Sequence, residues 1–133
     1  MIYKKTWKYI LIKEYDSIYY RPKALKDFSD VSKGNIGGYI DGGYHNLSQT
    51  GNCWIYNFAI ISNYAQIYDN ARISDDAVVR GNARVYGDAT VYGYAIIDGD
   101  AQIFENAQVS GDAVIAGNTK VSGNIVVSDY YDL

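Results

Sequence analysis

Aliphatic residues recur every six positions along most of this chain, and no other feature constrains its fold as strongly. A short period of this regularity is typical of a solenoid, in which each unit packs only on its neighbours. A helical interpretation fails, because glycine returns at the same period and would break each helix. The thirteen aliphatic positions follow one another without insertion: Ile55, Ile61, Ile67, Ile73, Val79, Val85, Val91, Ile97, Ile103, Val109, Ile115, Val121 and Val127.

The residues around each aliphatic position predict a strand and a corner. Two positions earlier the side chain is usually small, as at Ala77 and Ala83. Alternate residues of a strand share a face, so Ala-x-Val indicates a short strand with both of these side chains inward. Glycine followed by Asn or Asp comes next, as at Gly81 and Gly87, and supplies a corner with positive φ. The predicted fold class is therefore all-β, a single-stranded parallel β-helix.

The repeat resembles a known pattern. Val85-Tyr-Gly-Asp-Ala89-Thr matches the bacterial transferase hexapeptide motif at its aliphatic and small positions. Families with that motif form left-handed β-helices with three hexads per coil, so the resemblance implies about 4.5 coils over residues 47–127. It implies little about activity, since one fold hosts many functions. A right-handed solenoid of similar period is the alternative.

A narrower resemblance extends over nearly the whole chain. Gly37-Gly38-Tyr-Ile, Asn46-Leu-Ser-Gln and Gly51-Asn-Cys-Trp54 are similar to segments of a family of hexapeptide-repeat proteins carried by bacteriophages and mobile elements. This resemblance implies a phage-type accessory protein. It does not by itself imply an activity. The sequence shows no signal peptide, so we expect the protein to act in the cytoplasm of a host cell.

The repeat also divides the chain. We expect an N-terminal capping region over residues 1–46, the β-helix over residues 47–127 and a tail over residues 128–133. Residues 8–13 and 18–21 are predicted to pair as a hairpin around Asp16-Ser17. Gln49 occupies an aliphatic position in a weaker first unit. Capping is the expected role of residues 1–46, because solenoids must cover their end coils.

With three hexads per coil, residues 18 apart stack at about 4.8 Å and form outward columns. One column is aliphatic, a second is aromatic with Arg84 beside it, and a third face carries Trp54 and Tyr92. A contiguous apolar patch usually marks a contact, and interfaces favour Tyr. The aliphatic column is expected to be covered, either by the N-terminal segment or by a second chain. The interface candidates are Ile60, Val78, Ile96, Val114, Tyr68, Tyr86, Phe104, Arg84, Trp54 and Tyr92.

Charge argues against nucleic acid as a direct ligand. Residues 1–46 hold eight Lys/Arg against five Asp/Glu, which is a net charge of +3. Residues 47–133 hold four Lys/Arg against ten Asp/Glu, which is a net charge of −6. An acidic rod has no general affinity for nucleic acid or an anionic membrane. No apolar run approaches the length of a membrane span. We expect a protein partner, no metal and no cofactor.

Catalytic candidates are few. His45 is the single histidine and precedes the coils, whereas hexapeptide acyltransferases generally use a histidine near a subunit interface. No coil carries an inserted loop. Cys53 occupies an inward small position, and the corner residues Asp69 and Asp75 suit backbone chemistry more than acid catalysis. A non-catalytic binding protein is therefore the leading hypothesis, with a coenzyme A-dependent acyltransferase and a structural virion component as alternatives.

The C-terminal end suggests self-association. Only six residues follow Val127, which is too few for a folded cap. The last coil would then present the apolar ring of Ile115, Val121 and Val127, and an open strand edge invites pairing. Two such ends could abut about a two-fold axis as a homodimer. The end-to-end contact candidates are Val127, Tyr130, Tyr131 and Leu133, the last three of which could instead fold over the ring as a plug.

Overall fold

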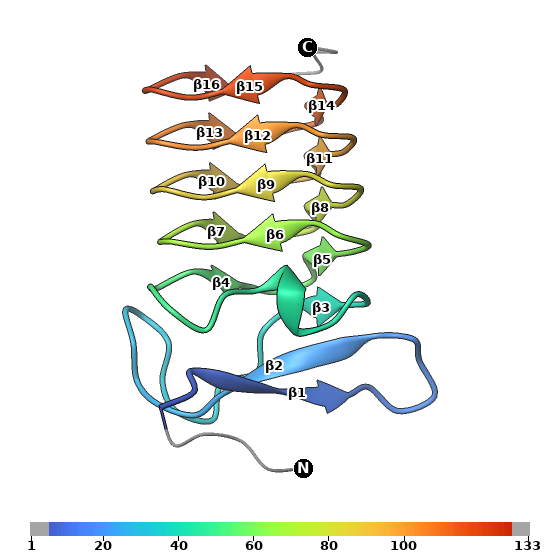
Figure 1. Cartoon of the computed structure of the whole chain (residues 1–133), viewed down its shortest axis with the longest axis vertical. Helices are drawn as coiled ribbons and strands as arrows, with labels where there is room; N and C mark the ends of the chain where they lie inside the picture. The colour runs from blue at the N-terminus through green and yellow to red at the C-terminus, as the bar shows by residue number, and fades with distance from the viewer. Residues whose placement is uncertain (1–5, 129–133) are drawn as a thin grey trace.

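The computed structural model describes residues 6–128 of the chain. These residues form an all-β rod of stacked coils, with residues 6–46 at its N-terminal end (Figure 1). Each strand of the coils has two residues: β4 (Trp54–Ile55), β5 (Ile60–Ile61), β6 (Gln66–Ile67), β7 (Arg72–Ile73), β8 (Val78–Val79), β9 (Arg84–Val85), β10 (Thr90–Val91), β11 (Ile96–Ile97), β12 (Gln102–Ile103), β13 (Gln108–Val109), β14 (Val114–Ile115), β15 (Lys120–Val121) and β16 (Val126–Val127).

Strands that lie 18 residues apart pair in parallel, which establishes three six-residue units per coil. Ile96, for example, lies opposite Val78 on one side and Val114 on the other. The coil strands form three sheets, ordered β5-β8-β11-β14, β15-β12-β9-β6 and β16-β13-β10-β7-β4. In Figure 1 the front strand β6 runs to the left, β7 returns behind it and the chain rises, so the helix is left-handed. The predicted parallel β-helix is confirmed.

Small and aliphatic side chains alternate in the interior of the rod. From Cys53 to Ile115, every residue at these two positions is at most 1% exposed. Burial of so much apolar surface in a narrow interior is the main stabilising contribution.

Polar corner residues join one coil to the next. Asp69 and Asp75 have positive φ values of 56° and 57°. Asp69 Oδ2 accepts the N–H of Gly87 at 3.1 Å, and Asp75 Oδ2 accepts the N–H of Gly93 at 3.0 Å. Each carboxylate therefore satisfies a backbone donor one coil above it, which gives these acidic residues a structural role.

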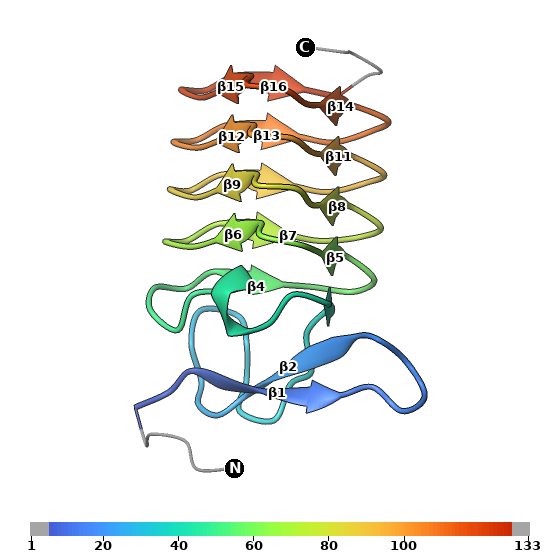
Figure 2. The ribbon, with the colours of Figure 1, turned by 45° about the vertical axis from the view of Figure 1, so that its right-hand side comes forward.

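The N-terminal region continues one sheet of the rod. It contains β1 (Tyr9–Lys13), β2 (Tyr20–Ala24), β3 (Tyr39–Ile40) and the 3-10 turn η1 (Tyr44–Asn46). β1 and β2 form the predicted hairpin, β2 pairs antiparallel with β3, and β3 pairs in parallel with β5. One sheet thus runs β1-β2-β3-β5-β8-β11-β14, and both views place the hairpin of β1 and β2 below the coils (Figures 1 and 2).

This region also supplies hydrogen-bond donors to the first coil. Each coil donates its N–H groups to carbonyl groups of the coil above, as Arg72 N does to Ala89 O at 3.0 Å. The carbonyl groups of the first coil therefore point toward the N-terminal region. Their donors include Gly38 N to Ile55 O at 2.9 Å, Asn46 Nδ2 to Ala65 O at 2.7 Å and Lys8 Nζ to Cys53 O at 2.8 Å.

Contacts between the N-terminal region and the first coil explain why Gln49 and Gly38 stand at their positions. Gln49 stands at an aliphatic position because its side chain holds β1: Oε1 accepts the N–H of Lys8 at 2.8 Å, and Nε2 donates to Tyr9 O at 3.0 Å. Gly38 passes so close to the first coil that a Cβ would lie 2.6 Å from Ile55 Cγ2. Any larger residue at that position would push the chain away from the coil.

Candidate functional site

The aliphatic face is the column of outward side chains on β5, β8, β11 and β14: Ile60, Val78, Ile96 and Val114. All four are half-buried. The described N-terminal residues do not fold back over them. Tyr39 on β3 pairs beside Ile60, and β3 lies below β5 in Figure 1. Arg80 Nε and Asp98 Oδ2 form an ion pair of 3.0 Å on its flank. Covering of this face by a second chain stays a prediction.

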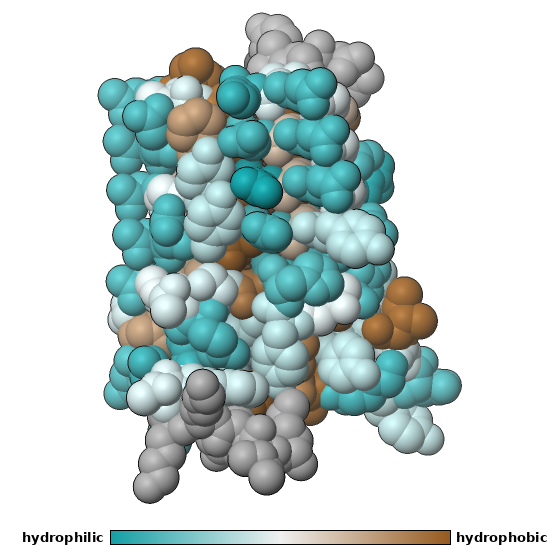
Figure 3. Space-filling model, in the orientation of Figure 1, coloured by the Kyte–Doolittle hydropathy of each residue, from teal (hydrophilic) through white to brown (hydrophobic). Residues whose placement is uncertain are grey.

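The aromatic face is the column that follows β6, β9 and β12: Tyr68, Tyr86 and Phe104. The Tyr68 and Tyr86 rings stack at 4.8 Å, and the Tyr86 and Phe104 rings at 5.1 Å, with interplanar angles of 5° and 4°. Tyr86 Oη donates to Gln102 Oε1 at 2.9 Å. Partial burial, then the neighbouring Tyr86, raises the pKa of Tyr68, while Arg84 opposes this. Pale and brown side chains accordingly run up this front face in Figure 3.

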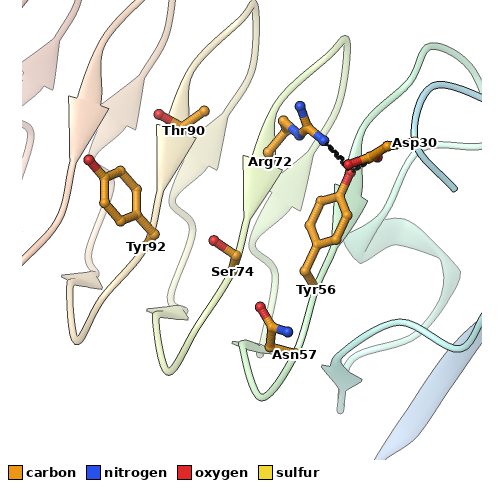
Figure 4. Close-up of a pocket in the computed structure, with 7 residues that line it drawn as sticks. All are labelled: Asp30, Tyr56, Asn57, Arg72, Ser74, Thr90 and Tyr92. Carbon is orange, nitrogen blue, oxygen red and sulfur yellow. Dashed lines mark hydrogen bonds and ion pairs between the residues drawn. The ribbon is translucent and has the colours of Figure 1, made fainter.

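The groove face is the third sheet, with the outward column of Tyr56, Ser74 and Tyr92. Asp30 reaches this column from the loop between β2 and β3 (Figure 4). A hollow of about 340 Å³ opens between the column and its neighbours. Its lining includes Asp30, Tyr56, Arg72, Ser74, Thr90 and Tyr92.

Three side chains at the lower end of this hollow form one hydrogen-bonded cluster. Tyr56 Oη donates to Asp30 Oδ1 at 2.7 Å, and Arg72 Nη2 donates to Tyr56 Oη at 3.0 Å and pairs with the other Asp30 oxygen. The Arg72 guanidinium carbon lies 5.2 Å from the centre of the Tyr56 ring. These contacts hold the Arg72 guanidinium in one orientation, so that its remaining N–H groups point in defined directions as hydrogen-bond donors.

The charges of this cluster balance. The hydrogen bond from Tyr56, then the nearby Arg72, holds the pKa of Asp30 below its ordinary value. Burial and the hydrogen bond to Asp30 raise the pKa of Tyr56 to about 12. At neutral pH the three groups are therefore an anion, a cation and a neutral phenol, with no net charge.

Trp54 requires a correction. The sequence placed it among outward interface residues, but it is only 2% exposed. Phe28 and Tyr9 pack against its ring, with centroids 5.2 Å and 6.2 Å away. The repeat could not reveal this, because both partners belong to the aperiodic N-terminal region. Trp54 joins the two regions and is no part of the accessible surface.

The C-terminal candidates are only partly within the described residues. Val127 is 6% exposed and Val121 is 2% exposed, so the expected open apolar ring is not seen at these positions. The exposed aliphatic residues of the last unit are instead Ile125 and Val126, at 53% and 59%. Tyr130, Tyr131 and Leu133 lie outside the described residues, and the end-to-end homodimer stays a prediction.

His45 and Cys53, two of the catalytic candidates from the sequence, each have a polar contact in the structure. His45 Nε2 lies 2.7 Å from the carbonyl oxygen of Asn63; since a carbonyl only accepts, this nitrogen carries the proton. Cys53 is fully buried, with Sγ 3.3 Å from Lys8 Nζ. Burial raises the pKa of the Cys53 thiol despite that lysine. A buried thiol of raised pKa is a poor nucleophile.

Sequence reasoning missed Asp30 and Lys8. Asp30 lies in a loop outside the repeat, so no spacing in the sequence predicts its contact with Arg72, 42 positions away. Lys8 is 1% exposed, although lysine is rarely buried. Burial lowers the pKa of Lys8. The alternation of Tyr56, Ser74 and Tyr92, in contrast, can be read directly from the 18-residue spacing.

Among residues 6–128, no group of three or more His, Cys, Asp or Glu side chains is arranged to hold a metal ion. The same residues contain no helix long and apolar enough to cross a membrane.

Comparison with known proteins bears on the coils. A family model described as the YdcK beta solenoid repeat matches residues 65–81 and 83–99. Both segments lie in the β-helix, across β6 to β8 and β9 to β11. No curated protein matches the chain. The similarity supports a repeat β-helix, and over these coils the chain is similar to the YdcK beta solenoid repeat.

Proposed function

We propose that this protein is a non-catalytic binding protein that docks a protein partner on its aromatic face. The observation that carries the proposal is the stacked column of Tyr68, Tyr86 and Phe104. Rings that are already ordered lose little conformational entropy on binding, so they favour a contact at low cost. Arg84 and Gln102 flank the column and supply the polar groups that interfaces place beside aromatic anchors.

Charge indicates the kind of partner. The β-helix and tail carry a net −6 over residues 47–133, with four Lys/Arg against ten Asp/Glu. An acidic rod favours a partner with a basic surface and repels nucleic acid. Proteins that bind nucleic acid have such basic surfaces. Together with the resemblance to phage-carried proteins, this supports a finer proposal: the partner is a host defence protein, such as a CRISPR effector nuclease, whose nucleic-acid groove the rod occupies.

The test is affinity capture from a bacterial host lysate followed by mass spectrometry and measurement of binding with the purified partner. Tyr86→Ala removes the central ring of the column. Tyr94→Ala is the matched control, since Tyr94 is an exposed corner residue outside the column. An aromatic anchor at an interface contributes enough that its loss should weaken binding at least about thirtyfold, whereas the control should bind normally.

Three results would overturn this proposal. Equal capture of the same proteins by wild type and Tyr86→Ala would show that the aromatic face is not the docking surface. Saturable binding of acetyl-coenzyme A in a calorimeter near the micromolar range would favour an acyltransferase. Recovery of the protein from purified virions, with no captured host protein, would favour a structural component.

A further inference from the structure

The groove face lacks one aromatic ring that the aromatic face possesses. On the aromatic face the column after each strand carries a ring in three successive coils. On the groove face the equivalent column carries Tyr56, then Ser74, then Tyr92. Strand register places these three residues in successive coils, since Trp54 pairs with Arg72 and Arg72 with Thr90. Ser74 therefore leaves a space where its neighbours would accommodate a ring.

The size of this space follows from the coil spacing. Stacked rings on the aromatic face lie 4.8 Å and 5.1 Å apart, which is one coil per ring. The backbones at Tyr56 and Tyr92 are two coils apart, or about 9.6 Å. One ring fits at that separation. Figure 4 shows the two tyrosines on either side of Ser74, with open space between them. The hollow that they line has a volume of about 340 Å³, which is at the lower end of the range for small-molecule sites.

The polar groups around this space define the ligand. Asp30 and Tyr56 orient the Arg72 guanidinium through its Nη2 atom, and a guanidinium has five N–H donors, so further donors remain. Hydroxyl groups of Ser74, Thr90 and Tyr92 line the same hollow. A ring that carries several hydrogen-bonding groups on its rim suits this lining better than a hydrocarbon ring, which would leave those groups unpaired.

The charges around the hollow and the chemistry of its tyrosine rings narrow the class of ligand that it can bind. Asp30 neutralises Arg72, and residues 47–133 carry a net −6, so an anionic ligand gains nothing here. The face of a tyrosine ring is electron-rich and attracts weakly positive C–H groups. A pyranose has C–H groups on its faces and hydroxyl groups on its rim. We propose that this hollow binds one neutral pyranose unit of a saccharide, stacked on Tyr92 and hydrogen-bonded to Arg72, Ser74 and Thr90.

The test is ligand-observed NMR with the whole protein and a panel of glucose, galactose, mannose, N-acetylglucosamine and their short oligomers. A ligand of this size should bind with a dissociation constant on the order of 1 mM. Ser74→Tyr fills the space and should abolish saturation transfer to the sugar. Ser122→Tyr is the matched control: it adds a tyrosine at the equivalent position of the next coil on the aromatic face, and should bind as wild type does.

Tyr92→Ala keeps the proposal testable if Ser74→Tyr disturbs the fold. This variant removes the stacking surface and should weaken binding at least tenfold, while thermal melting reports that the rod is intact. The proposal is overturned if no sugar in the panel binds, or if Ser74→Tyr and Tyr92→Ala bind the sugar as well as wild type. Binding of a tyrosine-containing peptide in place of every sugar would also overturn it, in favour of a protein ligand. None of these outcomes depends on the aromatic face.

Discussion

The β-helix and the N-terminal region solve the same problem, the pairing of backbone groups, by different means. In the β-helix each coil forms backbone hydrogen bonds with the next coil. The same alternation of small and aliphatic residues fills the interior throughout. The N-terminal region has no second copy of itself to pair with, and individual side chains join it to the first coil: Lys8 and Asn46 from this region, and Gln49 from the first unit of the β-helix. Repetition is enough to continue a solenoid, whereas its first coil requires specific chemistry.

If the two regions depend on each other, the largest effect should come from the residue that joins them. Trp54→Ala removes a ring packed between Phe28 and Tyr9. Loss of a buried tryptophan should lower the free energy of unfolding by about 3–5 kcal/mol. Urea denaturation followed by circular dichroism measures this change. Tyr94→Ala, at an exposed corner, should change stability by less than about 0.5 kcal/mol; a similar loss in both variants would contradict the role of Trp54.

The next effect concerns the donors of the N-terminal region. Lys8→Ala removes a buried stem and leaves Cys53 O without the Lys8 donor, which should cost about 2–3 kcal/mol. Lys8→Met keeps the stem and removes only the donor, so it should cost about 1–2 kcal/mol. Urea denaturation of both variants separates packing from hydrogen bonding. A Lys8→Met protein more stable than wild type would mean that desolvation of the ammonium outweighs its hydrogen bonds.

Within the β-helix, equivalent positions should respond equally. Ile73 and Ile97 are both fully buried, and Ile→Val at either position should cost about 1 kcal/mol. Chemical denaturation of the two variants should give values that agree within roughly 0.5 kcal/mol, because each coil contacts only its neighbours. A much larger cost at Ile73 would show that the N-terminal region influences coils beyond the first.

The smallest effect should come from the ion pair that crosses between the regions. Tyr56 first, then Arg72, lowers the pKa of Asp30 from its ordinary 3.8. The carboxylate therefore stabilises the folded chain above pH 3.8, and this contribution is lost as pH falls below that value. Both partners are exposed, with side chains 43% and 55% accessible, so the contribution is a few tenths of a kcal/mol. Asp30→Asn should flatten the loss of stability below pH 3.8 by that amount. An unchanged profile in calorimetric melts would exclude a stabilising role.

The contrast between the regions also explains what the sequence could predict. The 18-residue register, the inward alanines and the columns of Tyr68 or Val78 follow from a period that any window of the repeat displays. The burial of Trp54 depends on Phe28, and the groove cluster depends on Asp30, both placed by loops without periodicity. Low exposure of Val127 is likewise a property of the end of the rod. The periodic contacts recur at a fixed spacing of 18 residues, whereas the missed contacts of Trp54 and Asp30 follow no repeated spacing.

Uniform pairing across 18 residues makes the length of this rod an adjustable quantity. Each coil meets its neighbours through the same backbone contacts, so a tandem duplication of eighteen codons would insert one more layer without disturbing either end. Such a duplication would lengthen the molecule by about 4.8 Å and carry every outward column along with it. Descendants of one gene can therefore differ in rod length by whole coils, so that selection acts on length in equal steps.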